Sequence, residues 1–362
     1  MKVADRLDRQ YQMYAEEYKQ AAIGVLDSGW YVLGNEVKAF EQEFAWKMGA
    51  EYCIGVNSGL DALILAMRAL QIGQGDEVIV PSNTFIATVM SIVENGATPV
   101  FVEPDEYYHL DVKKIEMAIT EKTKAVIVVH LYGQAADMEK ILQLTKQYHL
   151  YLIEDCAQAH TAEYMGKTVG TWGDIGCFSF YPTKNLGAFG DSGAVITQDE
   201  MIAERIRTLR NYGSKVKYEN EVCGLNSRMD EIQAALLRVK LRHLDELTEQ
   251  RRRYVDFYFK EIRNPLITLP ELRPDATHVW HLFVIRCRQR DKLKRYLEVN
   301  EIYTQIHYPI PPHLQKCYAD MGYQRGDFPI AEQYADEVLS LPLYNGMREE
   351  ELRYVTDILN QF

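Results

Sequence analysis

The stretch that decides the fold class runs from residue 75 to residue 102 and reads GDEVIVPSNTFIATVMSIVENGATPVFV. Residues 77–80 and 99–102 are short, mainly apolar runs, which favour buried strands. Residues 85–94 between them carry apolar side chains at helical spacing and stop at Asn95-Gly96, a typical end of a helix. A strand, a helix and a second strand in this order predict two parallel strands joined by a helical crossover.

The same alternation continues toward the middle of the chain. We predict further strands at residues 125–129, 150–153, 177–180 and 194–197, and further helices at residues 113–119 and 138–148. Strands that are apolar throughout are buried on both faces, so we expect a mostly parallel sheet with helices on either side. This α/β class binds its ligands beyond the carboxyl ends of the strands.

The pattern changes in the last third of the chain. A long helical stretch covers about residues 229–260, and Pro265 follows it. Beyond it we predict strands at residues 279–287 and 302–306, and helices at residues 291–299, 330–339 and 349–359. We therefore expect a large domain over residues 1–250 and a smaller C-terminal α+β domain over residues 251–362.

Composition excludes several classes of protein. The 362 residues include 52 acidic and 40 basic side chains, and the net charge of −12 argues against a nucleic acid partner. No apolar run is long enough to span a membrane and no apolar signal segment begins the chain, so we expect a cytoplasmic protein. The six cysteines form no CxxC pair, and HExxH, P-loop and GxGxxG spacings are missing, so we expect no metal site.

Two predicted helix starts suit an anion. Ser58-Gly59 precedes the apolar helix at residues 62–70, and Asn226-Ser227-Arg228 precedes the long helix. Free N–H groups and the helix dipole at such starts favour a phosphate. The alternative for both is ordinary capping of the helix.

Two other segments follow predicted strands and carry reactive groups. Asp155 lies between a strand and Gln158-Ala159-His160, where its carboxylate can pair with a protonated ring nitrogen or simply cap a turn. Lys184 lies in an apolar and aromatic stretch, where loss of water lowers the pKa of the amine and makes it nucleophilic. The alternative is a surface lysine on a loop. We interpret His278 and His281 as structural.

Taken together, these segments resemble the DegT/DnrJ/EryC1/StrS family of sugar aminotransferases along nearly the whole chain. The matching blocks are residues 29–34, 57–63, 75–78, 81–88, 130–134, 154–160 and 179–187. The resemblance implies the type I, aspartate aminotransferase-like fold with a large, mostly parallel seven-stranded sheet. It also implies pyridoxal 5′-phosphate as cofactor.

The resemblance implies a role for each block. Lys184 would form the Schiff base with the cofactor and then move protons, and Asp155 would pair with the pyridinium nitrogen. Gln158 would approach the ring's O3′ and Phe85 would stack on the ring. The phosphate would be held by Ser58, Gly59, Leu60, Ser179 and, from the neighbouring subunit of a homodimer with shared sites, Asn226.

The implied reaction transfers the amino group of L-glutamate to a keto carbon of a nucleotide-linked hexose. The blocks most resemble those of enzymes acting at C-3 of dTDP-3-keto-6-deoxyhexoses, which make amino sugars for O-antigens, S-layers or natural products. We expect His160 near the sugar, as a third catalytic residue beside Lys184 and Asp155. Other substrate contacts are expected at Tyr181, Tyr212, Lys217, Tyr218, His307 and Tyr308. Thr161 departs from the glycine that many relatives carry.

Several alternatives remain at this point. A C-4 aminotransferase acting on a 4-keto sugar is the nearest one. Dehydratases of the family carry histidine in place of the lysine, and Lys184 argues against them. A non-catalytic regulator that binds cofactor or sugar would be expected to have lost Lys184 or Asp155, and a nucleotide-sugar oxidoreductase would need a glycine-rich fingerprint.

Overall fold

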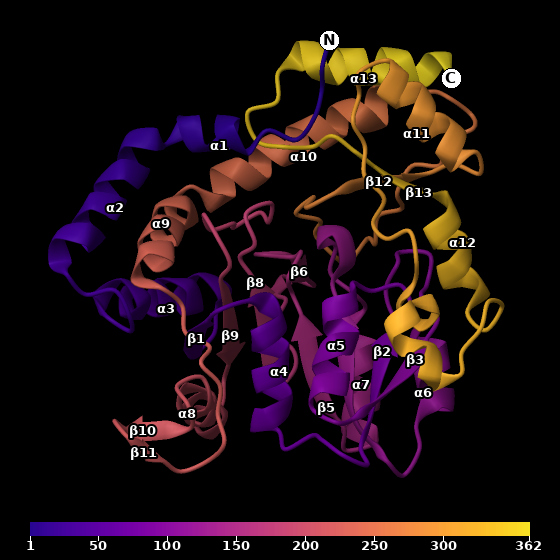
Figure 1. Ribbon diagram of the computed structural model, residues 1–362. Helices are drawn as coiled ribbons and strands as arrows, with labels where there is room; N and C mark the ends of the chain where they lie inside the picture. Colours follow the sequence, from indigo (N-terminus) through magenta and orange to yellow (C-terminus); the bar gives the residue numbers. More distant parts are fainter.

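The computed structural model describes residues 1–362, and its centre is a sheet of seven strands (Figure 1). The strands lie in the order β1-β9-β8-β5-β4-β2-β3. Only β9 runs antiparallel to its neighbours β1 and β8, so the predicted mostly parallel seven-stranded sheet is confirmed. The strands are β1 (Tyr52–Val56), β2 (Glu77–Pro81), β3 (Thr98–Val102), β4 (Thr123–Val129), β5 (Tyr151–Asp155), β8 (Ile175–Ser179) and β9 (Gly193–Thr197).

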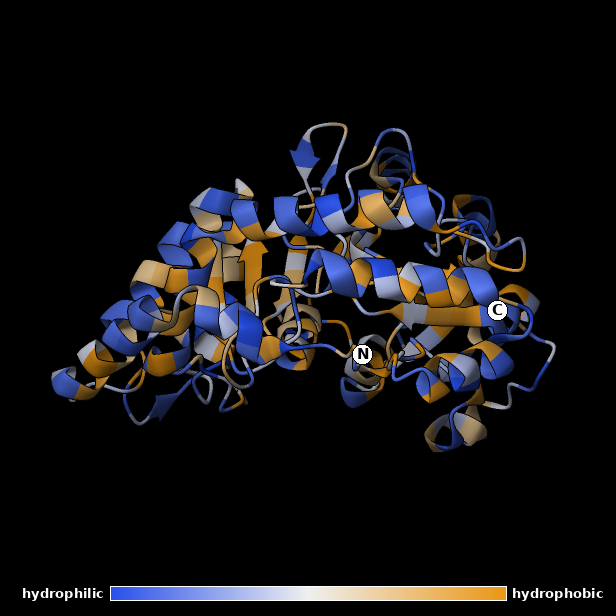
Figure 2. Cartoon of the chain, turned by 90° about the horizontal axis from the view of Figure 1, so that it is seen from above, coloured by the Kyte–Doolittle hydropathy of each residue, from blue (hydrophilic) through white to orange (hydrophobic).

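Both faces of this sheet are buried, because side chains alternate between two cores along each strand. Ile79 of β2 faces one core with Val126 and Val128 of β4, whereas Val78 faces the other with Ile127. Helices cover both faces: α3 (Asn35–Met48), α4 (Gly59–Ala69), α5 (Ile86–Glu94), α6 (Val112–Ala118), α7 (Met138–Gln147), α8 (Glu200–Leu209) and α9 (Glu231–Arg242). The first two helices, α1 (Leu7–Met13) and α2 (Ala15–Ser28), lie outside this layer, and α2 packs against α9. Viewed from above, hydrophobic strands lie between helices with hydrophilic outer surfaces (Figure 2).

A third core forms in the C-terminal part. It contains side chains from residue 255 onward together with Val3, which pairs with Ile302, so the two ends of the chain meet there (Figure 1). The elements of the C-terminal part are α10 (Leu244–Glu261), β12 (Phe283–Arg286), α11 (Arg290–Val299), α12 (Pro329–Glu337), β13 (Val338–Leu341) and α13 (Glu349–Gln361). Of these, α12 packs through Tyr334 in a separate small cluster. The expected domain boundary at residue 250 falls inside α10, and the division at that residue stays a prediction.

Three sequence predictions need correction here. The long helix at residues 229–260 is two helices, α9 and α10, which meet at His243. Residues 302–306 form isolated bridges at Ile302 and Gln305 instead of a strand, because no neighbouring strand runs beside them for more than one residue. The end of the helix predicted at residues 330–339 belongs to β13, which pairs with β12.

Short connections complete the chain. The small hairpins β6 (Glu163–Tyr164)–β7 (Lys167–Thr168) and β10 (Ser214–Val216)–β11 (Glu219–Asn220) lie outside the main sheet. No helix combines the length and apolar character needed to cross a bilayer. The parallel strands end at one edge of the sheet, and the segments after β5 and β8 carry the candidate site.

Candidate active site

Asp155 is the last residue of β5 and lies at the carboxyl edge of the sheet. Its carboxylate is buried and accepts hydrogen bonds from the Thr88 hydroxyl (2.9 Å) and the Ala157 N–H (3.1 Å). Burial raises the pKa of Asp155, and these two hydrogen bonds and nearby Lys184 oppose that rise. No cation of the chain forms an ion pair with this carboxylate, so it is free to pair with a positive group of a ligand.

Lys184 lies in the loop that follows β8, as predicted. Burial lowers the pKa of Lys184 to about 8, and the negative charge of Asp155 opposes this effect. Its Nζ lies 3.5 Å from Nε2 of His281, within hydrogen-bond distance. The loop is a tight turn, because the Lys184 N–H donates to the Tyr181 carbonyl and the Ala188 N–H to the Phe180 carbonyl. A half-buried amine with a lowered pKa is a nucleophile at moderate pH.

Gln158 connects side chains from distant parts of the chain at this edge. Its Oε1 accepts the Tyr132 N–H at 2.7 Å, and its Nε2 donates to the Tyr308 hydroxyl at 3.0 Å. The Tyr308 ring lies 5.0 Å from the ring of Phe85. Phe85 precedes α5 and is 47% exposed, so one face of a large aromatic ring is available for stacking.

The sequence left two functions open for the start of α4, a helix cap and an anion site, and the structure has the features of both. Ser58 caps the helix, because its hydroxyl accepts the Asp61 N–H at 3.1 Å. The N–H groups of Gly59 and Leu60 have no acceptor in the chain, so they remain available to an anion. A Cβ at Gly59 would lie 2.6 Å from the Cβ of Ser179, so glycine allows α4 to approach the end of β8.

The structure does not fit the expected contact between His160 and a sugar. The His160 ring has no exposed surface and packs against Phe178 and Phe180, with ring centroids 5.6 Å apart in each pair. Burial, followed by the charge of Lys184, lowers the pKa of His160 to about 3. His160 is therefore a neutral ring packed behind the lysine. Thr161 beside it has a φ of 64°, a backbone conformation in which glycine is unstrained and threonine is not.

The remaining predicted contacts lie in two places. His307 is half-buried near Lys184, where its Nδ1 lies 2.8 Å from the Ser340 hydroxyl and burial lowers its pKa to about 4; Tyr181 is exposed next to the lysine loop. The others, Tyr212, Lys217, Tyr218 and Asn226, are exposed on and beside the β10–β11 hairpin, and none contacts Lys184 or Asp155 of the same chain. Ser227, next to Asn226, ties this segment to Asn57 and Asp61 at the start of α4.

One buried group of potential metal ligands, His130, Glu154 and Cys156, lies behind the site. The Glu154 carboxylate accepts three backbone N–H groups and lies 3.1 Å from Nε2 of His130, whose Nδ1 accepts the Ala136 N–H. These atoms have protein partners, which indicates a structural polar cluster.

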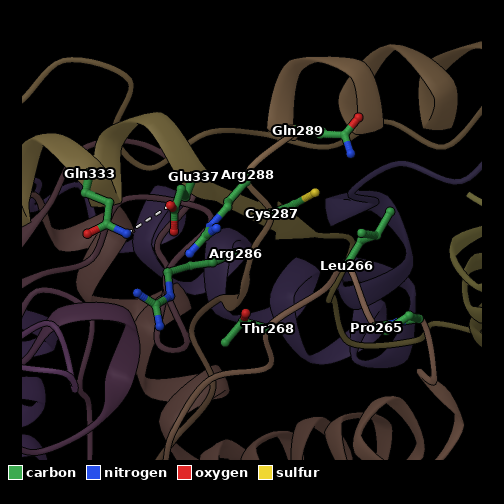
Figure 3. A pocket seen from close by; sticks show the side chains of 9 residues that line it. All are labelled: Pro265, Leu266, Thr268, Arg286, Cys287, Arg288, Gln289, Gln333 and Glu337. Atoms are coloured by element: carbon green, nitrogen blue, oxygen red, sulfur yellow. Dashed lines mark hydrogen bonds between the residues drawn. The ribbon is translucent and has the colours of Figure 1, made fainter.

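A separate hollow of about 450 Å³ lies between β12 and α12 (Figure 3). It contains none of the predicted site residues. Its lining is mainly polar: Pro265, Leu266, Thr268, Arg286, Cys287, Arg288, Gln289, Gln333 and Glu337.

Sequence reasoning missed two residues of the site. Thr88 lies in the first turn of α5, three positions after the N-cap residue Phe85, and its hydroxyl donates to Asp155. His281 lies almost a hundred residues from Lys184, and only the tertiary structure brings the two side chains together.

Comparison with known proteins shows relatives that match almost the whole chain. The chain is 54% identical over 356 residues to dTDP-3-amino-3,6-dideoxy-alpha-D-galactopyranose transaminase of Aneurinibacillus thermoaerophilus, with 98% of each chain covered. It matches the crystal structure of DesV from Streptomyces venezuelae in complex with a ketimine intermediate, with a TM-score of 0.97, 46% identity and coverage of 99% and 98% of the two chains. NtdA from Bacillus subtilis, solved with bound cofactor PMP, gives a TM-score of 0.92 at 32% identity, with 99% and 85% covered.

The fold and these relatives therefore define an α/β enzyme of the aminotransferase class. The sequence profile of one family matches residues 12–360. The chain belongs to the DegT/DnrJ/EryC1/StrS aminotransferase family. The expectations of a transferase and of an aminotransferase fold are thus confirmed, and the regulator and oxidoreductase alternatives are not.

Proposed function

We propose that this enzyme transfers the amino group of L-glutamate to the C-3 keto carbon of a dTDP-3-keto-6-deoxyhexose. The product is a dTDP-3-amino-3,6-dideoxyhexose. The observation that carries the chemistry is the half-buried amine of Lys184 near the buried carboxylate of Asp155 at the carboxyl edge of the sheet. The choice of sugar rests on similarity over almost the full chain to a transaminase named for a dTDP-3-amino-3,6-dideoxyhexose.

The residues at this edge fit pyridoxal 5′-phosphate. An unpaired buried carboxylate at Asp155 suits a protonated ring nitrogen, and the exposed face of Phe85 suits the ring itself. The free N–H groups of Gly59 and Leu60 suit the phosphate, with Ser58 and Ser179 beside them. When bound, this cofactor supplies the carbon that carries the amino group between substrates and a ring that takes up electrons.

Lys184 is the general acid/base in this proposal. Its amine has a pKa of about 8, so a substantial fraction is neutral near that pH and can accept a proton from a bound substrate. Asp155 stays ionised when a positive group lies beside it, because an opposite charge offsets the effect of burial. Gln158 is held in place by Tyr132 and Tyr308, so its amide can orient the ring's oxygen substituent.

Sugar recognition is proposed to involve two groups of residues. Tyr181, His307 and Tyr308 lie around the lysine loop of the same chain and are available to the hexose. Tyr212, Lys217 and Tyr218 of a neighbouring subunit would approach the nucleotide from the β10–β11 hairpin, where they are exposed. A local cation such as Lys217 can attract a diphosphate despite the negative net charge.

A homodimer with shared sites is part of the proposal. Asn226 is exposed beside the start of its own α4 and would reach the phosphate held by the partner. Exposed apolar side chains in the second half of α2 and just after it support an interface there: Ile23, Leu26, Trp30, Tyr31 and Val32. We place the enzyme in the cytoplasm, acting on soluble nucleotide sugars, with its two domains dividing near residue 250.

The first test is the absorbance spectrum of the purified enzyme with added pyridoxal phosphate, before and after L-glutamate. A visible band that glutamate bleaches would support the cofactor and the donor half-reaction. Lys184→Ala should form no such band, whereas Lys292→Ala, a change of an exposed lysine on α11, should behave like the wild type. A band that ignores glutamate would contradict the donor.

The second test separates C-3 from C-4 chemistry. The glutamate-treated enzyme is offered dTDP-3-keto- and dTDP-4-keto-6-deoxyhexoses in separate reactions, and the return of the visible band is followed. Return with the 3-keto sugar and not with the 4-keto sugar is expected. The opposite result would favour the C-4 alternative. The gluco and galacto epimers are then compared in the same assay.

A further inference from the structure

His281 is the one side chain of the protein within hydrogen-bond distance of Nζ of Lys184. Its Nε2 lies 3.5 Å from that atom, and the ring is almost completely buried. Burial holds the pKa of His281 well below its usual value, so the ring is neutral and one of its nitrogens can accept a hydrogen bond. Nδ1 has no partner in the chain and is free to carry the ring's proton.

The backbone around His281 is held rigidly by its neighbours. The Val279 N–H donates to the Gly133 carbonyl at 2.8 Å, and the Leu282 N–H donates to the Tyr132 carbonyl at 3.3 Å. Arg251 donates through Nη1 to the carbonyls of Trp280 and His281 at 3.0 and 3.3 Å. Trp280 has a φ of 53°, an uncommon value for a residue with a side chain, and these bonds hold the turn in that conformation.

The same network also holds the other end of Lys184. Lys240 donates to the Lys184 carbonyl at 3.4 Å and to Gln10 at 3.0 Å. Gln10 donates to Asn345 at 3.3 Å, and Asn345 accepts from Arg251 at 3.1 Å. A continuous series of polar contacts therefore links Nζ of Lys184, through His281, to the main-chain carbonyl of Lys184 itself. Its members come from α1, α9, α10, the turn before β12 and the segment after β13.

Resting on the proposed function, we propose that His281 is a positioning residue that accepts a hydrogen bond from the protonated Nζ of Lys184. It thereby holds the amine at one place and stabilises its charged form. The titratable groups that face or surround the amine are Asp155, His160, His281 and His307, with Lys240 behind its main chain. Only Asp155 is an anion, so His281 is the second group that favours the ammonium.

The test measures the titration of Lys184 in the full chain without cofactor. Acetic anhydride competes for all amines at a series of pH values, and mass spectrometry gives the labelling of the Lys184 peptide. Three variants are compared with the wild type. His281→Gln places an acceptor where Nε2 lies, His281→Asn places one only where Nδ1 lies, and His281→Phe places none.

We expect the midpoint for Lys184 to fall by about one pH unit in His281→Phe and His281→Asn, which is a tenfold change in proton affinity. His281→Gln should restore most of the wild-type midpoint. His278→Gln is the matched control, because His278 lies three residues earlier and contacts the Trp280 N–H instead of the lysine. Equal midpoints in all variants, or a change in His281→Gln as large as in His281→Phe, would overturn the proposal.

A second measurement does not depend on folding of the His281 variants. The ring nitrogens of the nine histidines are observed by ¹⁵N NMR in the wild type and in Lys184→Met. The largest change is expected at His281, and no change there would contradict the proposal. Neither measurement needs bound cofactor, so a failed glutamate assay with a normal His281 effect would count against the proposed function alone.

Discussion

At the residue scale, the proposed chemistry depends on one carboxylate and one amine. Asp155 is buried and Lys184 is half-buried, and loss of water raises the pKa of the acid and lowers that of the base. Both changes favour the uncharged forms of the two side chains. A positive ligand group beside Asp155 offsets the effect of burial and favours its carboxylate form. The site is therefore prepared for a cationic ring before any ligand enters.

Asp155→Asn tests this pairing. The amide keeps the shape of the side chain and can still accept from Thr88, but it carries no charge for a ring nitrogen. We expect retention of the cofactor and a fall in turnover of about 100-fold or more, by analogy with loss of other charge-stabilising groups. Steady-state kinetics and cofactor content measure the two effects.

Asp174→Asn is the control, because Asp174 accepts a backbone N–H from Leu152 at the opposite edge of the sheet. It should leave turnover near the wild-type rate. Normal turnover in Asp155→Asn would rule out the ionic pairing.

Lys240→Met tests how the buried amine of Lys240 changes the stability of the protein with pH. Burial lowers the pKa of Lys240 to about 7 from 10.5, so between these values the unfolded chain binds more protons than the folded one. The free energy of unfolding contributed by this group therefore rises with pH across that window, by ~1.4 kcal/mol per pH unit.

In Lys240→Met that rise should be lost, so its Tm should increase less between pH 7 and pH 10 than the Tm of the wild type. Differential scanning calorimetry at several pH values measures it. Lys292→Met changes an exposed lysine and should follow the wild type. If the Tm of Lys240→Met and the Tm of the wild type changed with pH in the same way, Lys240 would not titrate in this range.

At the element scale, the site depends on how closely α4 approaches β8. The periodicity of residues 62–70 predicts the helix, and its first residue is Gly59, next to the cap Ser58. The sequence could not show that Ser179, more than a hundred residues later, leaves no room for a Cβ at Gly59. Sequence patterns describe neighbours along an element, whereas this contact joins two elements.

Gly59→Ala should therefore displace the start of α4 and weaken the hold on the cofactor's phosphate. We expect the Kd for pyridoxal phosphate to rise by about tenfold or more, since movement of the helix start removes hydrogen bonds to an anion. Absorbance titration of the cofactor-free protein measures it.

Gly24→Ala in α2 is the matched control, because no atom lies within 4 Å of a Cβ built there. It should bind the cofactor as the wild type does and be slightly more stable, because alanine favours a helix. Equal Kd values in both variants would show that the approach of α4 to β8 does not set affinity for the phosphate.

At the scale of the whole molecule, the predicted contacts divide into two sets that do not meet within one chain. His307 and Tyr308 lie near Lys184, whereas Asn226, Tyr212 and Tyr218 are exposed near the β10–β11 hairpin. The shared site that we propose, completed by a partner subunit, would account for this division. The proposal predicts that two inactive variants can complement each other.

Lys184→Ala and Asn226→Asp are mixed, unfolded together and refolded. Each variant alone should be impaired, because one lacks the amine and the other places a negative charge near a phosphate. Random pairing should restore about a quarter of the wild-type sites, since half the dimers are mixed and each has one intact site. Activity at the mean of the two variants would mean that Asn226 serves its own chain.

The amino-acid sequence is enough to predict most of the elements and the chemistry that follows each strand. Apolar strands alternating with helices predict a parallel sheet because both of its faces must be buried. Asp155 and Lys184 are recognisable because they lie at the end of such a strand and in the loop after one. Which distant side chains meet is visible only in the folded chain. Burial of His160, the bond between Thr88 and Asp155 and the contact of His281 with Lys184 depend on packing between elements. Such contacts leave no periodic signal along the chain.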